Sequence, residues 1–198
     1  MLSDYEFMFS HGFEKYMYEL AEKYLTANPK AVLVCRIFEA LGTMSTVPRD
    51  KDSLHKRYIN GTAVQFHALY AGDAHEIAGL DEWFAHNSTT AGPQIDHTIP
   101  YIKYSWEPQF VSLTTIPFHD ENFPYLVRDN TVLRWEMCRM NYTFLLVHDH
   151  FMVHPGIKTK GVPRKHAIEQ YNFAASEFRE RMDRLYPETK SLCPAPRP

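Results

Sequence analysis

The sequence has little cysteine, no long apolar run and no excess of either charge. Three cysteines among 198 residues are too few and too scattered for a disulfide framework or a zinc ribbon. No apolar stretch approaches the roughly 20 residues that span a bilayer, and residues 1–10 lack the basic start and apolar centre of a signal peptide. A formal net charge of -3 gives no electrostatic reason to expect nucleic acid as a partner.

What is present is enough apolar surface for one core. Hydrophobic residues make up 44% of the chain and aromatic residues 14%, so we expect a single domain over residues 1–187 and a Pro-rich tail over residues 188–198 that is mobile. Cys35 and Cys138 are expected in the core. Cys193, in the tail, is expected to be a free thiol or to bridge to another molecule.

Apolar spacing predicts strands alternating with helices, which is typical of an α/β domain. A spacing of three and four residues predicts helices over 12–28, 130–140 and 168–185, and a shorter one before Gly61. Short apolar or β-branched runs predict strands over 31–38, 106–114, 142–147 and 151–153, and the end of another over 1–3. Residues 72–100, rich in Gly, Asn, Thr and Pro, are expected to form a long surface excursion.

Two acids stand one residue apart near the start of the chain. Asp4 and Glu6 follow the short apolar piece 1–3. Side chains alternate along an extended chain, so both carboxylates face the same side and can share one hard cation. Such an ion can neutralise a nucleotide diphosphate and help it leave. Alternatively, the two residues are solvated acids at a strand end.

A histidine and a lysine flank a Pro-Gly turn after the predicted strand 151–153. His154 projects from the strand end, where it either completes a metal site with Asp4 and Glu6 or serves as a hydrogen-bonded structural residue. Lys158 either contacts phosphate oxygens or belongs to a solvated face. Asp120, in the loop 117–123, is placed either as a general base or as the cap of a turn.

Several blocks of the chain, in order, resemble the LARGE-type glycosyltransferases, the family that includes the β-1,4-glucuronyltransferase acting on dystroglycan glycans. Residues 1–7 resemble the family's strand and Asp-x-Asp metal motif, with Glu6 in place of the second Asp. Residues 31–39 resemble its buried strand ending in Phe-Glu. The later blocks are Trp106-Glu107-Pro108, Asp120 to Phe123, Glu136-Met137 and Phe151 to Lys158. The similarity runs from Met1 to about Pro187.

The resemblance implies a GT-A fold, a mixed sheet flanked by helices, here beginning at the metal motif and lacking its N-terminal nucleotide-binding strands. It implies transfer of a sugar with inversion from a UDP-sugar to a glycan acceptor, with Mn²⁺ or Mg²⁺ as cofactor and glucuronic acid favoured over xylose. Residue by residue, it implies Asp4, Glu6 and His154 as metal ligands and Lys158 as a diphosphate contact. It leaves Asp120 as our candidate for the base.

The resemblance also implies the Golgi lumen, although we see no targeting or transmembrane segment in the chain. Three N-glycosylation sequons, at Asn60, Asn87 and Asn141, favour a protein that passes through the lumen of the secretory pathway. The competing hypothesis is a non-catalytic relative, or a truncated fragment, that binds glycan or a partner protein.

Overall fold

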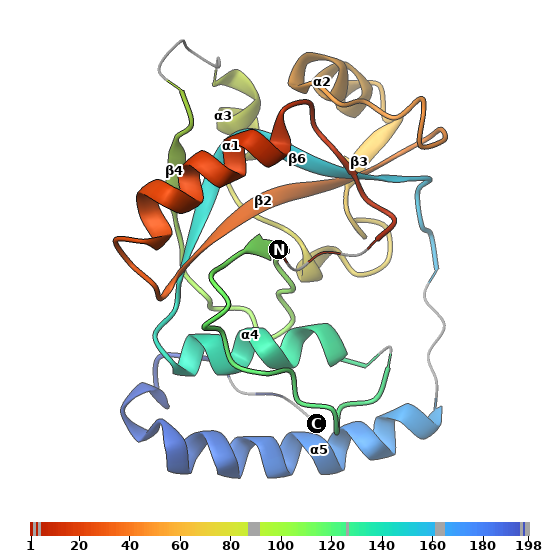
Figure 1. The fold of residues 1–198 in the computed structure, drawn as a ribbon. Helices are drawn as coiled ribbons and strands as arrows, with labels where there is room; N and C mark the ends of the chain where they lie inside the picture. Colours follow the sequence, from red (N-terminus) through yellow and green to blue (C-terminus); the bar gives the residue numbers. More distant parts are fainter. Residues whose placement is uncertain are drawn as a thin grey trace.

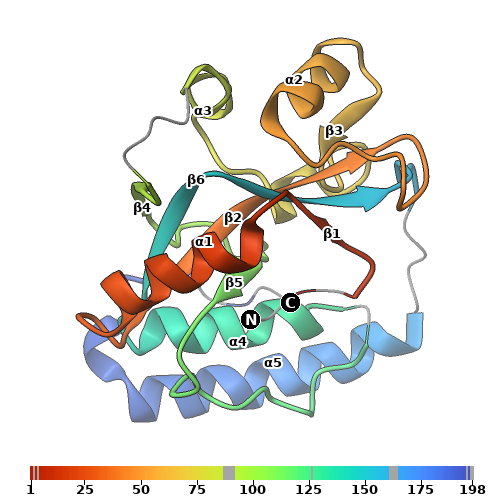
Figure 2. The ribbon, with the colours of Figure 1, turned by 45° about the horizontal axis from the view of Figure 1, so that its top comes forward.

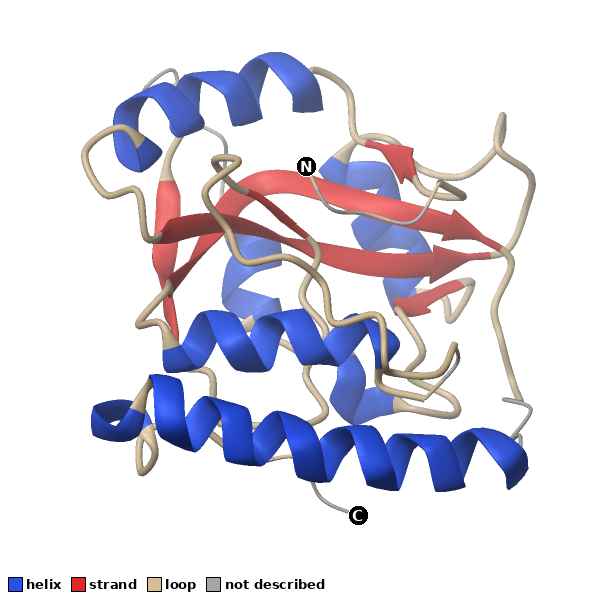
Figure 3. Ribbon diagram, turned by 60° about the horizontal axis from the view of Figure 1, so that its bottom comes forward, coloured by secondary structure: helices blue, strands red, loops and turns tan. Residues whose placement is uncertain are grey.

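The chain folds around a mixed sheet with helices on both faces. The computed structural model describes residues 1, 3, 5–86, 92–125, 127–160, 165–194 and 196. Within these residues six strands form one sheet in the order β1-β6-β2-β3, with β4 added to β6 and β5 to β2. Helix α1 lies over one face, and α4 and α5 lie together over the other (Figure 1; Figure 3). The predicted α/β class, a GT-A-like mixed sheet flanked by helices, is confirmed.

The longest connection between the main elements runs from β5 to α4. Their bounds are β1 Met8–Phe9, α1 Phe13–Leu20, β2 Ala31–Ala40, α2 Lys51–Ile59, β3 Ala63–Gln65, α3 Leu80–Ala85, β4 Ile95–Ile99, β5 Phe110–Val111, α4 Asp129–Arg139, β6 Thr143–Pro155 and α5 Lys165–Leu185. The helices predicted over 130–140 and 168–185 are therefore confirmed, and the one predicted over 12–28 is α1, which continues as a short π-helix over Ala21–Leu25. Of the helices that the structure describes, none combines the length and the apolar character that crossing a bilayer requires.

The centre of the sheet is the parallel pair β2 and β6. They pair from Ala31 opposite Thr143 to Ala40 opposite Pro155, with one shift of register between Val34 and Arg36, and all ten residues of β2 are buried. The other strands pair antiparallel with one of these two and are short (Figure 2). The carboxyl ends of both parallel strands consequently meet at one edge of the sheet, where open α/β sheets bind ligands.

Alternation along β2 divides the core between the two faces. Val32 and Val34 belong to the cluster that α4 and α5 cover, whereas Leu33 and Cys35 belong to the cluster under α1. Successive side chains of a strand point to opposite faces, so a run that is apolar throughout needs helices on both sides. The predicted core position of Cys35 is confirmed, since it is 2% exposed.

Three expectations about strands need correction. The chain over 142–153 is one strand, β6, rather than two, because Asp149 adopts a left-handed conformation (φ 65°) and the pairing with β2 shifts there without ending. Neither Met1 nor Ser3 is in a strand, and the first strand is β1, which pairs with the end of β6. Only Phe110 and Val111 of the strand expected over 106–114 pair with β2.

The predicted surface excursion over 72–100 is instead partly structured and partly buried. It contains α3 and β4, and Trp83 of α3 is completely buried, with its ring 5.9 Å from that of Phe38. Arg36 of β2 donates to the Ile77 carbonyl at 2.6 Å and also to that of Ala78. A buried cation thus satisfies the backbone of this segment, which sequence periodicity could not show.

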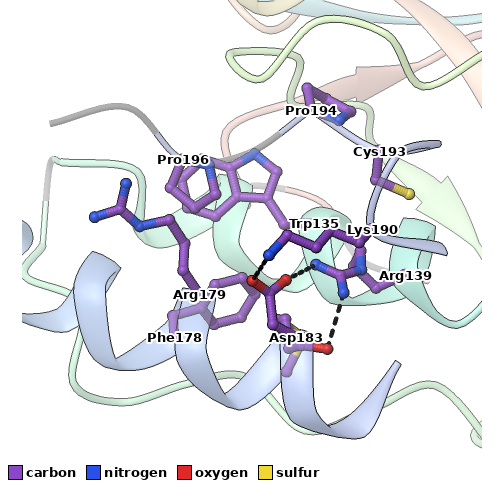
Figure 4. Close-up of a pocket in the computed structure, with 10 residues that line it drawn as sticks. Trp135, Arg139, Phe178, Arg179, Asp183, Lys190, Cys193, Pro194 and Pro196 are labelled. Carbon is purple, nitrogen blue, oxygen red and sulfur yellow. Dashed lines mark hydrogen bonds and ion pairs between the residues drawn. The ribbon is translucent and has the colours of Figure 1, made fainter. Parts of the chain in front are cut away.

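The C-terminal tail is tied to α4 and α5. Cys138 of α4 forms a disulfide with Cys193. The prediction that Cys138 is a core residue with a free thiol is therefore wrong, and so is the prediction that Cys193 is free or bridges to another molecule. Arg139 donates to the carbonyls of Met182 and Tyr186 and to Asp183, which also pairs with Lys190 at 2.6 Å (Figure 4). These contacts enclose a pocket of about 290 Å³ against α5. For the tail residues that the structure describes, the prediction of a loose end is wrong.

Candidate functional site

Two of the predicted site residues meet at the carboxyl ends of β2 and β6. His154, near the end of β6, is paired in register with Glu39 of β2. Its Nε2 lies 3.0 Å from Oε2 of Glu6, which comes from the chain just before β1. This hydrogen bond is the main reason that the pKa of Glu6 is lowered, so the carboxylate stays ionised.

The geometry of this pair fits two ligands of one divalent ion. Two ligands at right angles, each about 2.1 Å from an ion, stand about 3.0 Å apart, and the His154 and Glu6 atoms show that separation. The other ring nitrogen of His154, Nδ1, lies 3.3 Å from the Gly156 carbonyl oxygen. Metal-binding histidines usually donate their second ring N–H to such an acceptor.

The third predicted ligand, Asp4, lies outside the described residues. Among the residues that are described, no three His, Cys, Asp or Glu side chains are grouped to hold a metal ion. The Glu6 side chain is 44% exposed and that of His154 13%, so the pair is accessible from solvent on one side. Glu6 and His154 lie together as the predicted metal motif requires, and their role as metal ligands, with Asp4, stays a prediction.

Lys158 lies on the loop that leaves this site. Its backbone amide donates to Oε2 of Glu39 at 3.1 Å, and the Gly156 amide donates to the Ala40 carbonyl at 2.7 Å. Both bonds hold the loop against the end of β2. Lys158 itself is exposed, with Nζ 5.9 Å from the centre of the Phe66 ring. Its ammonium group is therefore available to an anion bound beside Glu6 and His154.

A second polar group, which the sequence did not lead us to predict, borders the first. The Phe66 ring lies 5.8 Å from that of His154, 3.7 Å from that of His67 and 4.8 Å from that of His75. His75 Nε2 is 3.9 Å from Oε2 of Glu107. Phe66 thus joins the Glu6–His154 pair to a deeper cluster around His75.

Burial sets the protonation of this deeper cluster. It lowers the pKa of His67 to about 4, with help from the charges of Lys158 and His154, and that of His75 to about 3. It raises the pKa of Glu107, against a hydrogen bond of 2.7 Å from Thr131. All three pKa shifts follow from the loss of solvation that a charged group suffers when buried. Both histidines are therefore neutral near pH 7.

The neutral His75 predicts a specific dependence of stability on pH. Its folded pKa lies below the value of about 6.5 for an unfolded histidine. As pH falls below about 6.5 the unfolded chain binds a proton that the folded chain does not, so His75 lowers the free energy of unfolding progressively towards pH 4. The raised pKa of Glu107 acts in the opposite direction.

Comparing the wild type with a variant that lacks the His75 imidazole isolates the contribution of this residue to the pH dependence of stability. Urea unfolding at pH 7 and pH 5 should show that a His75→Phe variant loses less stability on acidification than the wild type. An identical loss in both proteins would contradict the buried, neutral state of His75.

Asp120 lies apart from these groups, in the loop packed on α5. Arg181 donates to its Oδ2 at 2.8 Å, and the Asn122 amide donates to its Oδ1 at 3.0 Å. Burial opposes ionisation, but these hydrogen bonds hold the pKa of Asp120 below its usual value. The structure therefore shows it as the turn cap that was the alternative reading, with an added ion pair. Its assignment as the base stays a prediction.

Sequence reasoning left out four residues of the deeper cluster: Glu39, His67, His75 and Glu107. Glu39, at the end of β2, and Glu107, in the segment before β5, stood within blocks already noted, the Phe-Glu strand end and Trp-Glu-Pro, and these blocks were the available signal. His67 and His75 lie in irregular segments, where no apolar periodicity predicts which way a side chain points. Only the pairing of β3 with β2 and the packing of Phe66 bring them to the site.

The mixed α/β sheet flanked by helices is consistent with a GT-A-like fold. The family model described as "Glycosyl-transferase for dystroglycan" matches residues 1–188, and the chain belongs to this family. A relative, beta-1,4-glucuronyltransferase 1 of Danio rerio, is 25% identical over 166 residues. That match covers 82% of this chain and 38% of the relative, so the chain spans well under half of the relative's length.

Proposed function

We propose that this chain carries the metal and diphosphate site of an inverting glycosyltransferase, which transfers a sugar from a UDP-sugar to a glycan acceptor. The single observation that carries the proposal is the 3.0 Å approach of Glu6 and His154 at the carboxyl ends of β2 and β6. Membership of the glycosyltransferase family supports it. Glucuronic acid is the favoured sugar, since the matched relative is a glucuronyltransferase, and xylose is the alternative.

The roles follow from the positions of the side chains. Glu6 and His154, with Asp4, would hold Mn²⁺ or Mg²⁺, and Lys158 would contact the diphosphate from the adjoining loop. A divalent ion bound there would neutralise the UDP leaving group. The hydrogen bond that the Lys158 amide donates to Glu39 keeps the loop in place, so its backbone is already positioned when the donor substrate binds.

Inversion requires a base on the face of the sugar opposite the leaving UDP. A carboxylate takes the proton from the acceptor hydroxyl as that oxygen bonds to the anomeric carbon and the bond to UDP breaks. Asp120 remains our candidate for this base. To act, its carboxylate must first leave the ion pair with Arg181.

The Golgi lumen is the proposed location. A disulfide between Cys138 and Cys193 is favoured in an oxidising compartment. Asn60 and Asn141, two of the three sequon asparagines, are exposed, and Asn87 lies outside the described residues. Both observations agree with the location that the family suggests.

Sugar transfer by the purified chain tests the proposal. With Mn²⁺ and a panel of oligosaccharides, we expect UDP release and an extended glycan from UDP-glucuronate or UDP-xylose. A Glu6→Ala variant should release no UDP above background, because one of two described metal ligands is gone. Equal turnover by the wild type and by this variant would overturn the metal assignment.

A non-catalytic, glycan-binding member of the family is the second candidate. The observation that favours it is the engagement of Asp120 by Arg181, which occupies the proposed base. Binding on a glycan array together with no cleavage of any UDP-sugar would support this candidate against the first.

A further inference from the structure

Three exposed apolar side chains lie on two adjoining segments beyond the end of β2. Leu41 and Met44, in the loop that follows β2, are 52% and 55% exposed, and Ile59, the last residue of α2, is 70% exposed. A single exposed apolar residue is ordinary, but several that gather on one surface mark an interaction site or an aggregation hazard. We call these three residues the α2 patch.

Hydrogen bonds hold the two segments of the patch together. The Arg57 guanidinium, from α2, donates to the carbonyl oxygens of Leu41 at 2.8 Å and Thr46 at 2.7 Å. The Leu41 amide in turn donates to the Thr62 carbonyl at 2.9 Å. The loop after β2 and the end of α2 therefore lie side by side (Figure 1), and their exposed apolar residues belong to one surface.

An N-glycosylation sequon begins at the residue that follows Ile59. Asn60 is exposed and is the C-cap of α2, Gly61 adopts a left-handed conformation with φ 69°, and Thr62 completes the sequon. Asn60 adjoins one patch residue in the chain, and Thr62 bonds to the backbone of another, Leu41. A group attached to the Asn60 side chain therefore starts beside the α2 patch.

The sequon at Asn141 is exposed too but lies at the opposite end of the sheet. It precedes Thr143, which pairs with Ala31 at the start of β2, whereas Leu41 follows the end of β2. The ten residues of this extended strand cover about 30 Å. A glycan on Asn141 starts far from the α2 patch, which makes this asparagine the matched control.

The chemistry of an N-linked glycan suits such a patch. A sugar ring presents C–H groups that can pack on apolar side chains, while its hydroxyl groups stay hydrated, so the glycan is bulky and solubilising. Its attachment joins Nδ2 of the asparagine to the anomeric carbon of a lipid-linked oligosaccharide pyrophosphate. The bond from that carbon to the pyrophosphate breaks, and the amide loses one proton.

We propose that Asn60 is N-glycosylated and that its glycan covers the α2 patch, which without this cover drives self-association of the chain. The inference rests on the proposed lumenal location, since the oligosaccharide donor belongs to the secretory pathway. It is independent of the proposed metal and diphosphate ligands. The exposed apolar residues beyond β2 are then the surface on which the chain's own glycan packs.

Expression of the full 198-residue chain in mammalian cells, behind a cleavable secretion signal, tests the proposal. Peptide mass spectrometry after enzymatic release of N-glycans should show that Asn60 has been converted to aspartate. Asn60→Gln and Thr62→Ala should each abolish this modification and lower the monomer fraction in size-exclusion chromatography by about twofold or more. Thr62→Ser, which keeps the sequon, should match the wild type in both measurements.

Two further variants separate the patch from glycosylation in general. Asn141→Gln should lose its own glycan and keep the monomer fraction of the wild type, because its glycan starts at the other end of the sheet. Adding Ile59→Lys to Asn60→Gln should restore the monomer fraction without a glycan, because a charge then replaces the most exposed apolar side chain of the patch.

An unmodified Asn60 would overturn the proposal, whether or not Asn141 carries a glycan. A modified Asn60 whose removal leaves the monomer fraction unchanged would overturn the covering role, since the patch then needs no cover. The added signal carries the chain into the lumen, and sugar transfer by the same secreted protein is assayed separately. Absence of transfer would refute the proposed function and leave the glycan on Asn60 standing.

Discussion

A His154→Ala variant is expected to lose at least about 100-fold in affinity for UDP in the presence of Mn²⁺. Removing even an outer-shell partner of a metal site costs about 10- to 100-fold in affinity or activity, and we propose His154 as a direct ligand beside Glu6. The loss should disappear when Mn²⁺ is omitted, since binding without metal does not use the imidazole. Isothermal titration in buffers with and without Mn²⁺ measures both effects.

The matched control is another histidine of the same strand. His150 lies four residues earlier on β6, with Nδ1 2.9 Å from Oγ of Ser10, and has no contact with Glu6 in the described structure. His150→Ala should therefore bind Mn²⁺ and UDP as the wild type does, although its stability falls. A His154→Ala protein with full metal-dependent affinity would remove His154 from the site.

Loss of the Cys138–Cys193 disulfide is expected to lower the melting temperature by roughly 4 to 16 °C. The bridge closes a loop of 55 residues, and cross-links of this kind contribute about 2–4 kcal/mol, chiefly by restricting the unfolded chain. In a chain of this size each kcal/mol shifts the melting temperature by about 2–4 °C. Cys193→Ser should show the shift in differential scanning calorimetry.

Reductant provides the control for this prediction. Dithiothreitol should lower the melting temperature of the wild type to that of Cys193→Ser and should leave the variant unchanged. The remaining cysteine, Cys35, is free and buried, so it offers no alternative bridge without unfolding. A wild type that is insensitive to reductant and that shows three free thiols by mass spectrometry would contradict the disulfide.

The sequence predicts those elements that local chemistry determines. Strand β2 is a run of apolar residues between breakers and becomes the fully buried centre of the sheet. Helix α5 carries apolar residues at a spacing of three and four, and the buried Tyr171, Ala175 and Phe178 lie on its inner face. In α5 the apolar spacing indicates which side is buried, and in β2 the mostly apolar run indicates that both faces are buried.

The features that were missed depend on contacts between distant parts of the chain. The approach of Glu6 and His154, 148 residues apart, was predicted, but the pairing of Glu39 and His154 beside it was not. Cys138 and Cys193 are 55 apart, with no spacing rule to pair them. Trp83 is buried because its segment packs against Arg36 and Phe38 of β2. The Gly- and Pro-rich composition of residues 72–100 predicted a surface loop instead.

The central claim is that Glu6 and His154 form part of one linked site for a divalent ion and a nucleotide diphosphate. Thermal melts of the purified chain with Mn²⁺ alone, UDP alone and both together test it most directly. We expect a cooperative melt whose midpoint rises by clearly more with both ligands than by the sum of the two separate shifts, because each ligand binds the folded state more tightly when the other is present. A cooperative melt that does not respond to the two together would contradict it.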